Sequence, residues 1–208
     1  MRVKKLLLPL LFAALAAATP AAAQTDERKF EFFGGYSYLR ADTDEVDEPF
    51  TDFKNIMDGF NVAATGYVSK RVGITGDFSA HFHSITNDSV VGEFTAKTRT
   101  YNFTAGPQVR FPGHGRVTPF LHALAGVAHN RLTIDAPPPI QFDPTNSLGL
   151  TDFTLMLGGG LDVRLGERVS LRLVQFDYNP VFIRERPEVG IESTRLDNFR
   201  VSVGLVFR

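Results

Sequence analysis

The sequence lacks cysteine and tryptophan altogether, and it has no excess of basic residues. Without cysteine the chain can form no disulfide bond, thiolate metal site or cysteine nucleophile, and it has no N-terminal cysteine for lipid attachment. Its 22 lysines and arginines are balanced by 23 aspartates and glutamates, so the composition does not favour a nucleic-acid-binding protein. A hydrophobic content of 43% excludes a disordered chain. No long apolar run follows the first 23 residues, so no transmembrane helix is expected there.

The first 23 residues have the three-part organisation of a secretory signal peptide. Three basic residues precede an apolar stretch at 6–18, which is too short to span a bilayer, and a small-x-small motif of alanines follows. This pattern predicts a signal peptide over residues 1–23, cleaved before Gln24. A short tail at 24–29 and one folded domain at 30–208 would remain.

The rest of the chain repeats a period of two. In the clearest segment, Phe78 and Phe82 fall on one face, whereas Asp77 and Ser79 fall on the other. A helix would not sort residues by parity, so such segments are predicted to be β-strands. The eight predicted strands cover residues 30–39, 60–68, 72–83, 99–111, 117–129, 153–165, 169–179 and 198–207.

The connections between these segments alternate in length. Short gaps of three to five residues follow the second, fourth and sixth segments, and much longer gaps follow the first, third, fifth and seventh. This alternation predicts an up-and-down antiparallel meander with all short turns at one end. In the seventh segment the apolar residues move from odd-numbered to even-numbered positions part-way along the strand. One extra residue near Val174 would cause this change, so we predict a β-bulge there.

Alternation alone does not say which face points outward. A secreted, lipocalin-like ligand-binding barrel would show the same pattern with its apolar face inward. Here the polar faces are rich in glycine and serine, their cations are arginines, and the four lysines after the predicted signal peptide lie at strand ends or in connections. Each clean strand also offers about 10 residues without charge on its apolar face, the length that a tilted strand needs to cross a bilayer. We therefore predict an all-β protein, an eight-stranded antiparallel up-and-down transmembrane β-barrel whose first and last strands pair.

The interior of such a barrel is just wide enough to be filled by side chains. Acidic and arginine residues on the polar faces are nearly balanced, and an unpaired buried charge would cost several kcal/mol. We predict a structural ion network that plugs the barrel, and a narrow channel is the alternative if these pairs open. The predicted members are Glu31, Asp77, Arg110, Asp162, Arg164, Arg172, Asp177 and Arg200.

Other candidate sites are weaker. His81 and His83 share a face with Asp77, but two histidines without a clear third ligand do not define a metal site. Ser84 lies on the opposite face from His83, which argues against a barrel enzyme acting on envelope lipid, although that alternative stays open. The acidic segment at 42–58 lacks the spacing of a tight calcium loop, so at most loose binding of divalent cations is expected. We predict no catalytic, metal or cofactor site.

Three stretches resemble the OmpA-like barrel-domain proteins of Gram-negative bacteria, which are eight-stranded outer-membrane barrels. They are the strand at 116–128, the pair Asp177-Tyr178, and the terminal strand at 198–207, although Arg208 follows the usual final aromatic. The terminal strand looks like the family's C-terminal signal for insertion by the barrel-insertion machinery. Its alternating residues are Phe199, Val201, Val203, Leu205 and Phe207.

The resemblance implies a multi-pass protein of the Gram-negative outer membrane. The expected partners are outer-membrane lipid and lipopolysaccharide, together with the insertion machinery during biogenesis. The family's peptidoglycan-binding domain is not expected, because the chain stops at strand eight. The expected role is structural or one of surface interaction through four long extracellular loops, and the protein is expected to be a monomer.

Overall fold

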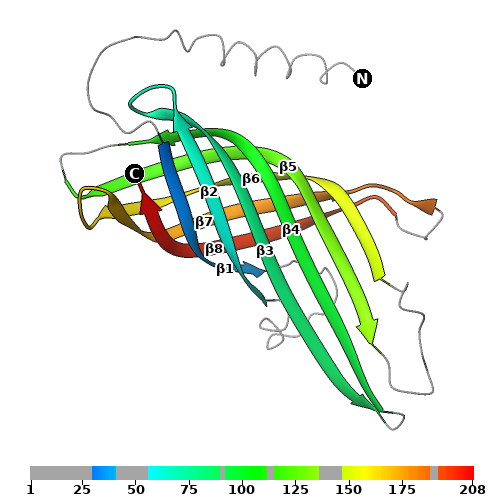
Figure 1. Ribbon diagram of the computed structural model, residues 1–208. Helices are drawn as coiled ribbons and strands as arrows, with labels where there is room; N and C mark the ends of the chain where they lie inside the picture. The colour runs from blue at the N-terminus through cyan, green and yellow to red at the C-terminus, as the bar shows by residue number, and fades with distance from the viewer. Residues whose placement is uncertain (1–29, 41–55, 90–91, 112–114, 136–146, 188–191) are drawn as a thin grey trace, which may run out of the picture.

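The computed structural model describes residues 30–40, 56–89, 92–111, 115–135, 147–187 and 192–208, and within 85–94, 134–135 and 147–148 only the backbone is described. The described residues form a closed antiparallel barrel in which each strand pairs with its neighbours in the sequence (Figure 1). The strands are β1 (Phe30–Arg40), β2 (Ile56–Tyr67), β3 (Val72–Ser89), β4 (Gly92–Arg110), β5 (Val117–Asp135), β6 (Ser147–Arg164), β7 (Val169–Ile183) and β8 (Thr194–Phe207).

The barrel closes between its first and last strands, as predicted. β1 pairs with β2 on one side and with β8 on the other, and Gly35 lies opposite Gly204 at this seam. A Cβ at Gly204 would overlap the backbone of β1, so glycine lets the two strands approach closely here. The predicted signal peptide at 1–23 and the tail at 24–29 lie outside the described residues. No helix in the described ranges is long and apolar enough to cross a membrane.

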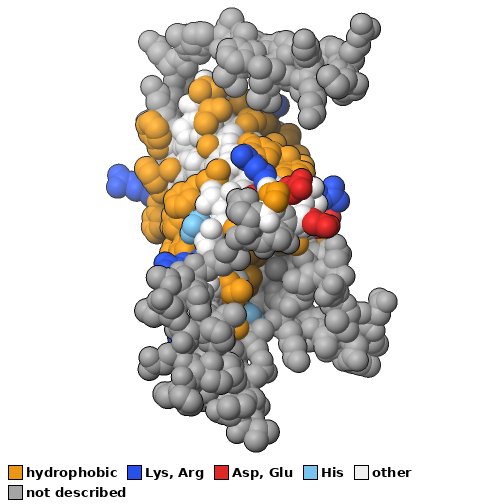
Figure 2. All heavy atoms as spheres, turned by 90° about the vertical axis from the view of Figure 1, so that its right-hand side faces the viewer, with side chains coloured by type: hydrophobic (Ala, Val, Ile, Leu, Met, Phe, Trp, Pro, Cys, Tyr) orange, Lys and Arg blue, Asp and Glu red, His pale blue; other side chains and the backbone are white. Residues whose placement is uncertain are grey.

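The apolar face of every strand points outward. Phe103 is 54% exposed and Leu157 is 46% exposed, whereas the residues between such positions are mostly buried. In the space-filling view hydrophobic side chains cover much of the described surface, and charged side chains form a few separate groups (Figure 2). The prediction that apolar side chains face away from the barrel axis is therefore confirmed.

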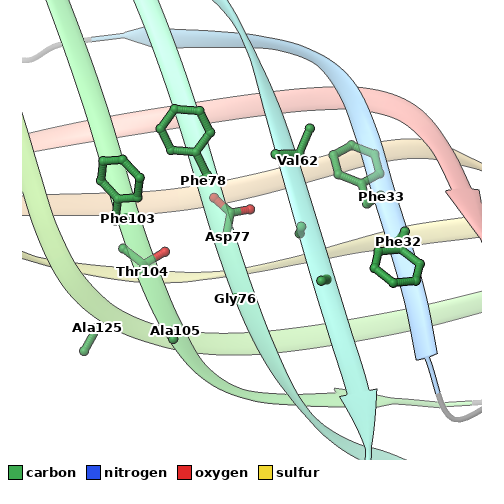
Figure 3. Close-up of a pocket in the computed structure, with 12 residues that line it drawn as sticks. Phe32, Phe33, Val62, Gly76, Asp77, Phe78, Phe103, Thr104, Ala105 and Ala125 are labelled. Carbon is green, nitrogen blue, oxygen red and sulfur yellow. The ribbon is translucent and has the colours of Figure 1, made fainter.

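The outward face also has a shallow apolar hollow of about 740 Å³. Its floor is a row of small residues that are paired across four strands, namely Ala64, Gly76, Ala105 and Ala125. Phenylalanine side chains stand around this row (Figure 3). In a membrane, acyl chains fill such a hollow.

The predicted β-bulge is present in β7. The register between β6 and β7 shifts between Leu161 and Asp162, and the register between β7 and β8 shifts between Arg172 and Gln175. Leu173 and the adjacent Val174 are both exposed. Because of this extra residue, the inward-facing polar positions are even-numbered before the bulge and odd-numbered after it. The β-bulge predicted near Val174 is therefore confirmed.

The strands differ in length more than the sequence pattern indicates. β3 to β6 have 18 or 19 residues each, whereas β1, β2, β7 and β8 have 11 to 15. The long loop expected between residues 83 and 99 is instead a strand hairpin that extends to Ser89 and resumes at Gly92 (Figure 1). Its residues are polar because they leave the membrane, and its β-branched threonines still favour strand.

Candidate functional site: the polar interior of the barrel

The barrel interior is centred on Arg200 of β8, whose side chain is fully buried. Its guanidinium donates two hydrogen bonds to Asp77 of β3, at 2.7 Å and 3.2 Å. Its Nε donates to Asp177 of β7 at 2.8 Å. One planar cation thus joins two carboxylates across the interior, a geometry that suits the fork of an arginine.

The two carboxylates have further partners. Asp177 also interacts with His122 of β5 at 2.7 Å and accepts a hydrogen bond from Gln175 at 2.8 Å. Asp77 accepts one from Asn61 at 3.1 Å. Because several donors share each carboxylate, the cost of burying these charges is offset by charge-assisted hydrogen bonds.

Glycine makes room for this arrangement. A Cβ at Gly158 of β6 would overlap the carboxylate of Asp177 and the backbone oxygen of Phe176. Gly158 lies directly opposite Asp177 in the ladder. The small residues that the sequence places on the polar face therefore leave space for inward-pointing charged side chains.

A second ion pair lies closer to the short turns. Arg172 of β7 binds Asp162 of β6 through two hydrogen bonds, at 2.8 Å and 3.2 Å. Its guanidinium lies over the rings of Phe33 and Phe120, with centroids 4.4 Å and 4.0 Å away. The cation–π contact explains why Phe33 stands on the otherwise polar face of β1.

A third group closes the short-turn end. Glu31 of β1 accepts hydrogen bonds from Arg110 at 2.9 Å, from Arg208 at 2.6 Å and from Tyr67 at 2.9 Å. Arg208 also reaches Asp162 at 3.3 Å. The last residue of the chain therefore links the first strand to the sixth.

These three groups form one continuous network. Arg172 donates to Gln175 at 2.8 Å, and Gln175 donates to Asp177, which connects the second ion pair to the central one. Arg208 connects Asp162 to Glu31. The connected residues, in order, are Arg110, Glu31, Arg208, Asp162, Arg172, Gln175, Asp177, Arg200 and Asp77.

Seven of the eight predicted members lie in this network, and Arg164 does not. Arg164 is exposed at the end of β6, and no described residue forms an ion pair with it. Its place at the strand end lets the side chain reach water, so including it in the buried network was wrong. Sequence reasoning missed His122 and Arg208 as members. The sequence does hold a signal for Arg208: its number has the same parity as that of Arg200, which predicts a side chain on the inward face.

The interior on the loop side of Arg200 is mostly uncharged, and its buried carboxylate, Asp152, pairs with Arg186 at 2.8 Å. Ser37 and His81 are 2.9 Å apart, and Asn102 donates to Ser79 at 3.3 Å. Several buried atoms here and nearby have no hydrogen-bond partner among the described residues. They are Asn61 Oδ1, His81 Nδ1, His83 Nε2, Asn102 Oδ1, Asn179 Oδ1 and Asn198 Oδ1.

A family model described as the outer membrane protein beta-barrel domain matches residues 9–207. The chain belongs to this family. The solved structure of Ail, the attachment invasion locus protein of Yersinia pestis, is similar in fold at 17% identity and a TM-score of 0.51, covering 86% of this chain and 97% of Ail. Ail in complex with the heparin analogue sucrose octasulfate matches at 18% identity and a TM-score of 0.53, with the same coverage.

The outer-membrane barrel OprG from Pseudomonas aeruginosa matches at 14% identity and a TM-score of 0.48, covering 86% of this chain and 94% of OprG. No curated protein matches the sequence. Membership of the outer-membrane barrel family confirms the predicted fold and the predicted location in the outer membrane of a Gram-negative bacterium. The terminal alternating residues, from Phe199 to Phe207, face outward on β8. Their use as an insertion signal stays a prediction.

Among the described residues of the barrel interior, one pair of side chains resembles catalytic groups. Ser37 and His81 resemble a nucleophile and its base, but both are fully buried, so no substrate reaches them. Asp77, which shares their face of the barrel, is held by Arg200. Among the described residues, no three His, Asp or Glu side chains converge as metal ligands. The acidic segment at 42–58 falls largely outside the described residues.

Proposed function

We propose that the protein is a closed, non-conducting barrel that holds a surface-exposed platform in the outer membrane and acts in envelope structure or surface interaction. The observation that supports this proposal best is the Asp77–Arg200–Asp177 bridge. Arg200 has no exposed surface, and its partners come from strands on different sides of the interior. An ion would have to break two buried ion pairs to pass.

The unequal strand lengths support the surface role. The strands β3 to β6 extend the barrel wall on the end away from the short turns, while the apolar outward face serves as the anchor. Loops and strand tips outside a rigid scaffold are where binding surfaces are most often found. The extended hairpins would therefore present the functional surface.

Planar-bilayer recording of the purified, folded protein tests the plugged interior. We expect no steady single-channel conductance, and heat-modifiable migration on a detergent gel would verify that the barrel is closed. Steady conductance would overturn the plugged interior and favour the narrow-channel alternative.

A shortened hairpin tests the surface role separately. Residues 85–96 would be replaced by a two-residue turn, which leaves the lower part of β3 and β4 in place. Cells that display this variant should lose a surface phenotype of the parent, such as attachment to coated surfaces or autoaggregation. A matched control replaces Glu167 with Gln in the short turn at the opposite end. If the shortened variant and the parent behave alike in both assays, the β3–β4 hairpin has no such role.

A further inference from the structure

Arginines recur at fixed places around the short-turn end of the barrel. Each short turn leads into the next strand through the same dipeptide, at Arg71-Val72, Arg116-Val117 and Arg168-Val169. The strands that return to this end, β4, β6 and β8, finish at or next to Arg110, Arg164 and Arg208. The three short turns therefore bring six arginines to one end of the molecule.

The strand pairing sets these arginines against one another. In each pair the backbone N–H of one arginine donates to the carbonyl oxygen of the other, at 2.8 to 2.9 Å, and the pairs are Arg71–Arg110, Arg116–Arg164 and Arg168–Arg208. Val117 lies directly opposite Val163, so Arg116 and Arg164 lie opposite each other one residue farther along the ladder. Like charges in such positions destabilise a strand pair. An anion between two of these side chains would remove the repulsion.

The side chains of this end face the mouth of the barrel and not the lipid. Arg116 has the parity of the buried Phe120, and Arg164 has the parity of the buried Asp162. The outward positions next to them are apolar and exposed, as in Val117 and Leu165. In outer-membrane barrels the short turns lie on the periplasmic side. An anion would therefore reach these arginines from the aqueous compartment below the barrel mouth.

One carboxylate of the protein already lies between two of these arginines. Glu31 accepts a hydrogen bond from Arg110 at 2.9 Å and another from Arg208 at 2.6 Å. Arg110 and Arg208 belong to different pairs, so this one carboxylate compensates part of the charge of both. The same end of the barrel thus shows how it binds a carboxylate, which is held between the guanidinium groups of two arginines.

The pair Arg116–Arg164 has no such carboxylate. Both side chains are exposed, and neither forms an ion pair or a side-chain hydrogen bond with any described residue. The other described carboxylates at this end are engaged: Asp162 pairs with Arg172 and Arg208, and Glu167 has an interaction of its own. The charge of Arg116 and Arg164 is therefore open to an anion from outside the barrel.

We propose that Arg116 and Arg164 bind a carboxylate of an acidic peptide on the periplasmic side of the membrane. An arginine can give a carboxylate two parallel, charge-assisted hydrogen bonds. A carboxylate is favoured over a phosphate because Glu31 and Asp162 show that the arginines of this end hold carboxylates. The site lies at the end opposite the extended hairpins, so it does not depend on the surface role proposed above.

Binding of a labelled tetraglutamate peptide to the folded barrel in uncharged detergent, measured by fluorescence anisotropy at physiological salt, tests the site. Tetraglutamine with the same label is the uncharged probe. The test variant is the double substitution Arg116→Gln and Arg164→Gln. The control is Arg99→Gln with Arg184→Gln, which removes the same charge from exposed arginines at the loop end. Heat-modifiable migration verifies that each protein is folded.

The parent and the control should bind tetraglutamate about tenfold more tightly than tetraglutamine, and the double variant should lose this preference. Equal binding of the two peptides by the parent would overturn the proposal, whether or not the double variant folds. So would an unchanged preference in the double variant, or an equal loss in the control.

Tripolyphosphate distinguishes a peptide site from a phosphate site. Displacement of the labelled tetraglutamate from the parent should need a higher concentration of tripolyphosphate than of unlabelled tetraglutamate. If a lower concentration sufficed, the pair would prefer phosphate, and the assignment to an acidic peptide would be wrong.

Discussion

The two parts of the barrel interior, on either side of Arg200, accommodate buried polar groups differently. From Arg200 toward the short turns, the interior is charged, and every buried carboxylate and guanidinium of the network has several partners. On the loop side of Arg200, most of the buried polar side chains are neutral asparagine, serine, threonine and histidine, and the Asp152–Arg186 pair is the charged exception among the described residues. The buried polar atoms that have no partner among the described side chains all belong to asparagine or histidine.

This difference follows from the cost of leaving a group unpaired. A buried amide oxygen without a hydrogen bond costs about 1 to 3 kcal/mol, whereas an uncompensated buried charge costs more. In the charged part, every buried charge must therefore have a partner, whereas the neutral part tolerates a few polar atoms without a hydrogen bond. We infer that the charged part fixes the register and closure of the strands, while the neutral part contributes mainly volume.

The largest effect is expected when the central cation is removed. Replacing Arg200 with Met would remove the arginine from both Asp77 and Asp177, which would stay buried with fewer donors. We expect the free energy of unfolding to fall by about 3 to 5 kcal/mol. Urea titration of the protein in lipid vesicles, followed by heat-modifiable migration, measures this change.

The matched control is Arg164→Met, which removes an arginine of the same barrel that has no ion pair with any described residue. Its cost should stay within about 0.5 kcal/mol, as is usual for exposed positions. If the two variants were equally stable, the buried bridge would contribute no more than a surface charge, and the contrast between the two parts of the interior would disappear.

A smaller effect is expected when the space for the network is reduced. In Gly158→Ala the new methyl group would overlap the Asp177 carboxylate and must push it away from its donors. We expect a loss of about 1 to 3 kcal/mol, the usual cost of overpacking. Gly76→Ala is the control, because a Cβ there meets nothing within 4 Å in the outward hollow. Equal stabilities in the same urea titration would show that the network can shift without cost.

Much of this fold can be predicted from sequence because the membrane leaves few solutions. The alternation of apolar and polar residues predicts the strands and their outward faces. Closure of the barrel follows because the backbone groups of every strand edge must be hydrogen-bonded in hydrocarbon. The bulge near Val174 was predictable for the same reason, since a single extra residue reverses parity. The length of β3 and β4 was not, because beyond the membrane the outward face is polar and the alternation that marks a strand fades.

The network was only partly predictable for a related reason. Parity shows which charges point inward, but it does not give their height along the barrel. Arg164 and Arg172 both stand at positions that face inward by parity. Arg164, however, is exposed to water, whereas the guanidinium of Arg172 lies over the rings of Phe33 and Phe120. His122 was equally hidden, because a single polar residue in an apolar strand has no partner until the register brings Asp177 near it.

The smallest effect is expected in the neutral part. In Asn102→Ala the protein loses a long hydrogen bond of 3.3 Å to Ser79 and also loses a buried oxygen that had no partner. These two changes oppose each other, so we expect a loss of about 1 kcal/mol or less. Asp77→Ala truncates a side chain of nearly the same size but leaves Arg200 with one carboxylate, and should cost about 3 to 5 kcal/mol. Because the two variants remove almost equal volumes, the difference between their urea midpoints isolates the charge. A loss for Asn102→Ala as large as that for Asp77→Ala would mean that packing, and not charge pairing, determines stability throughout the interior.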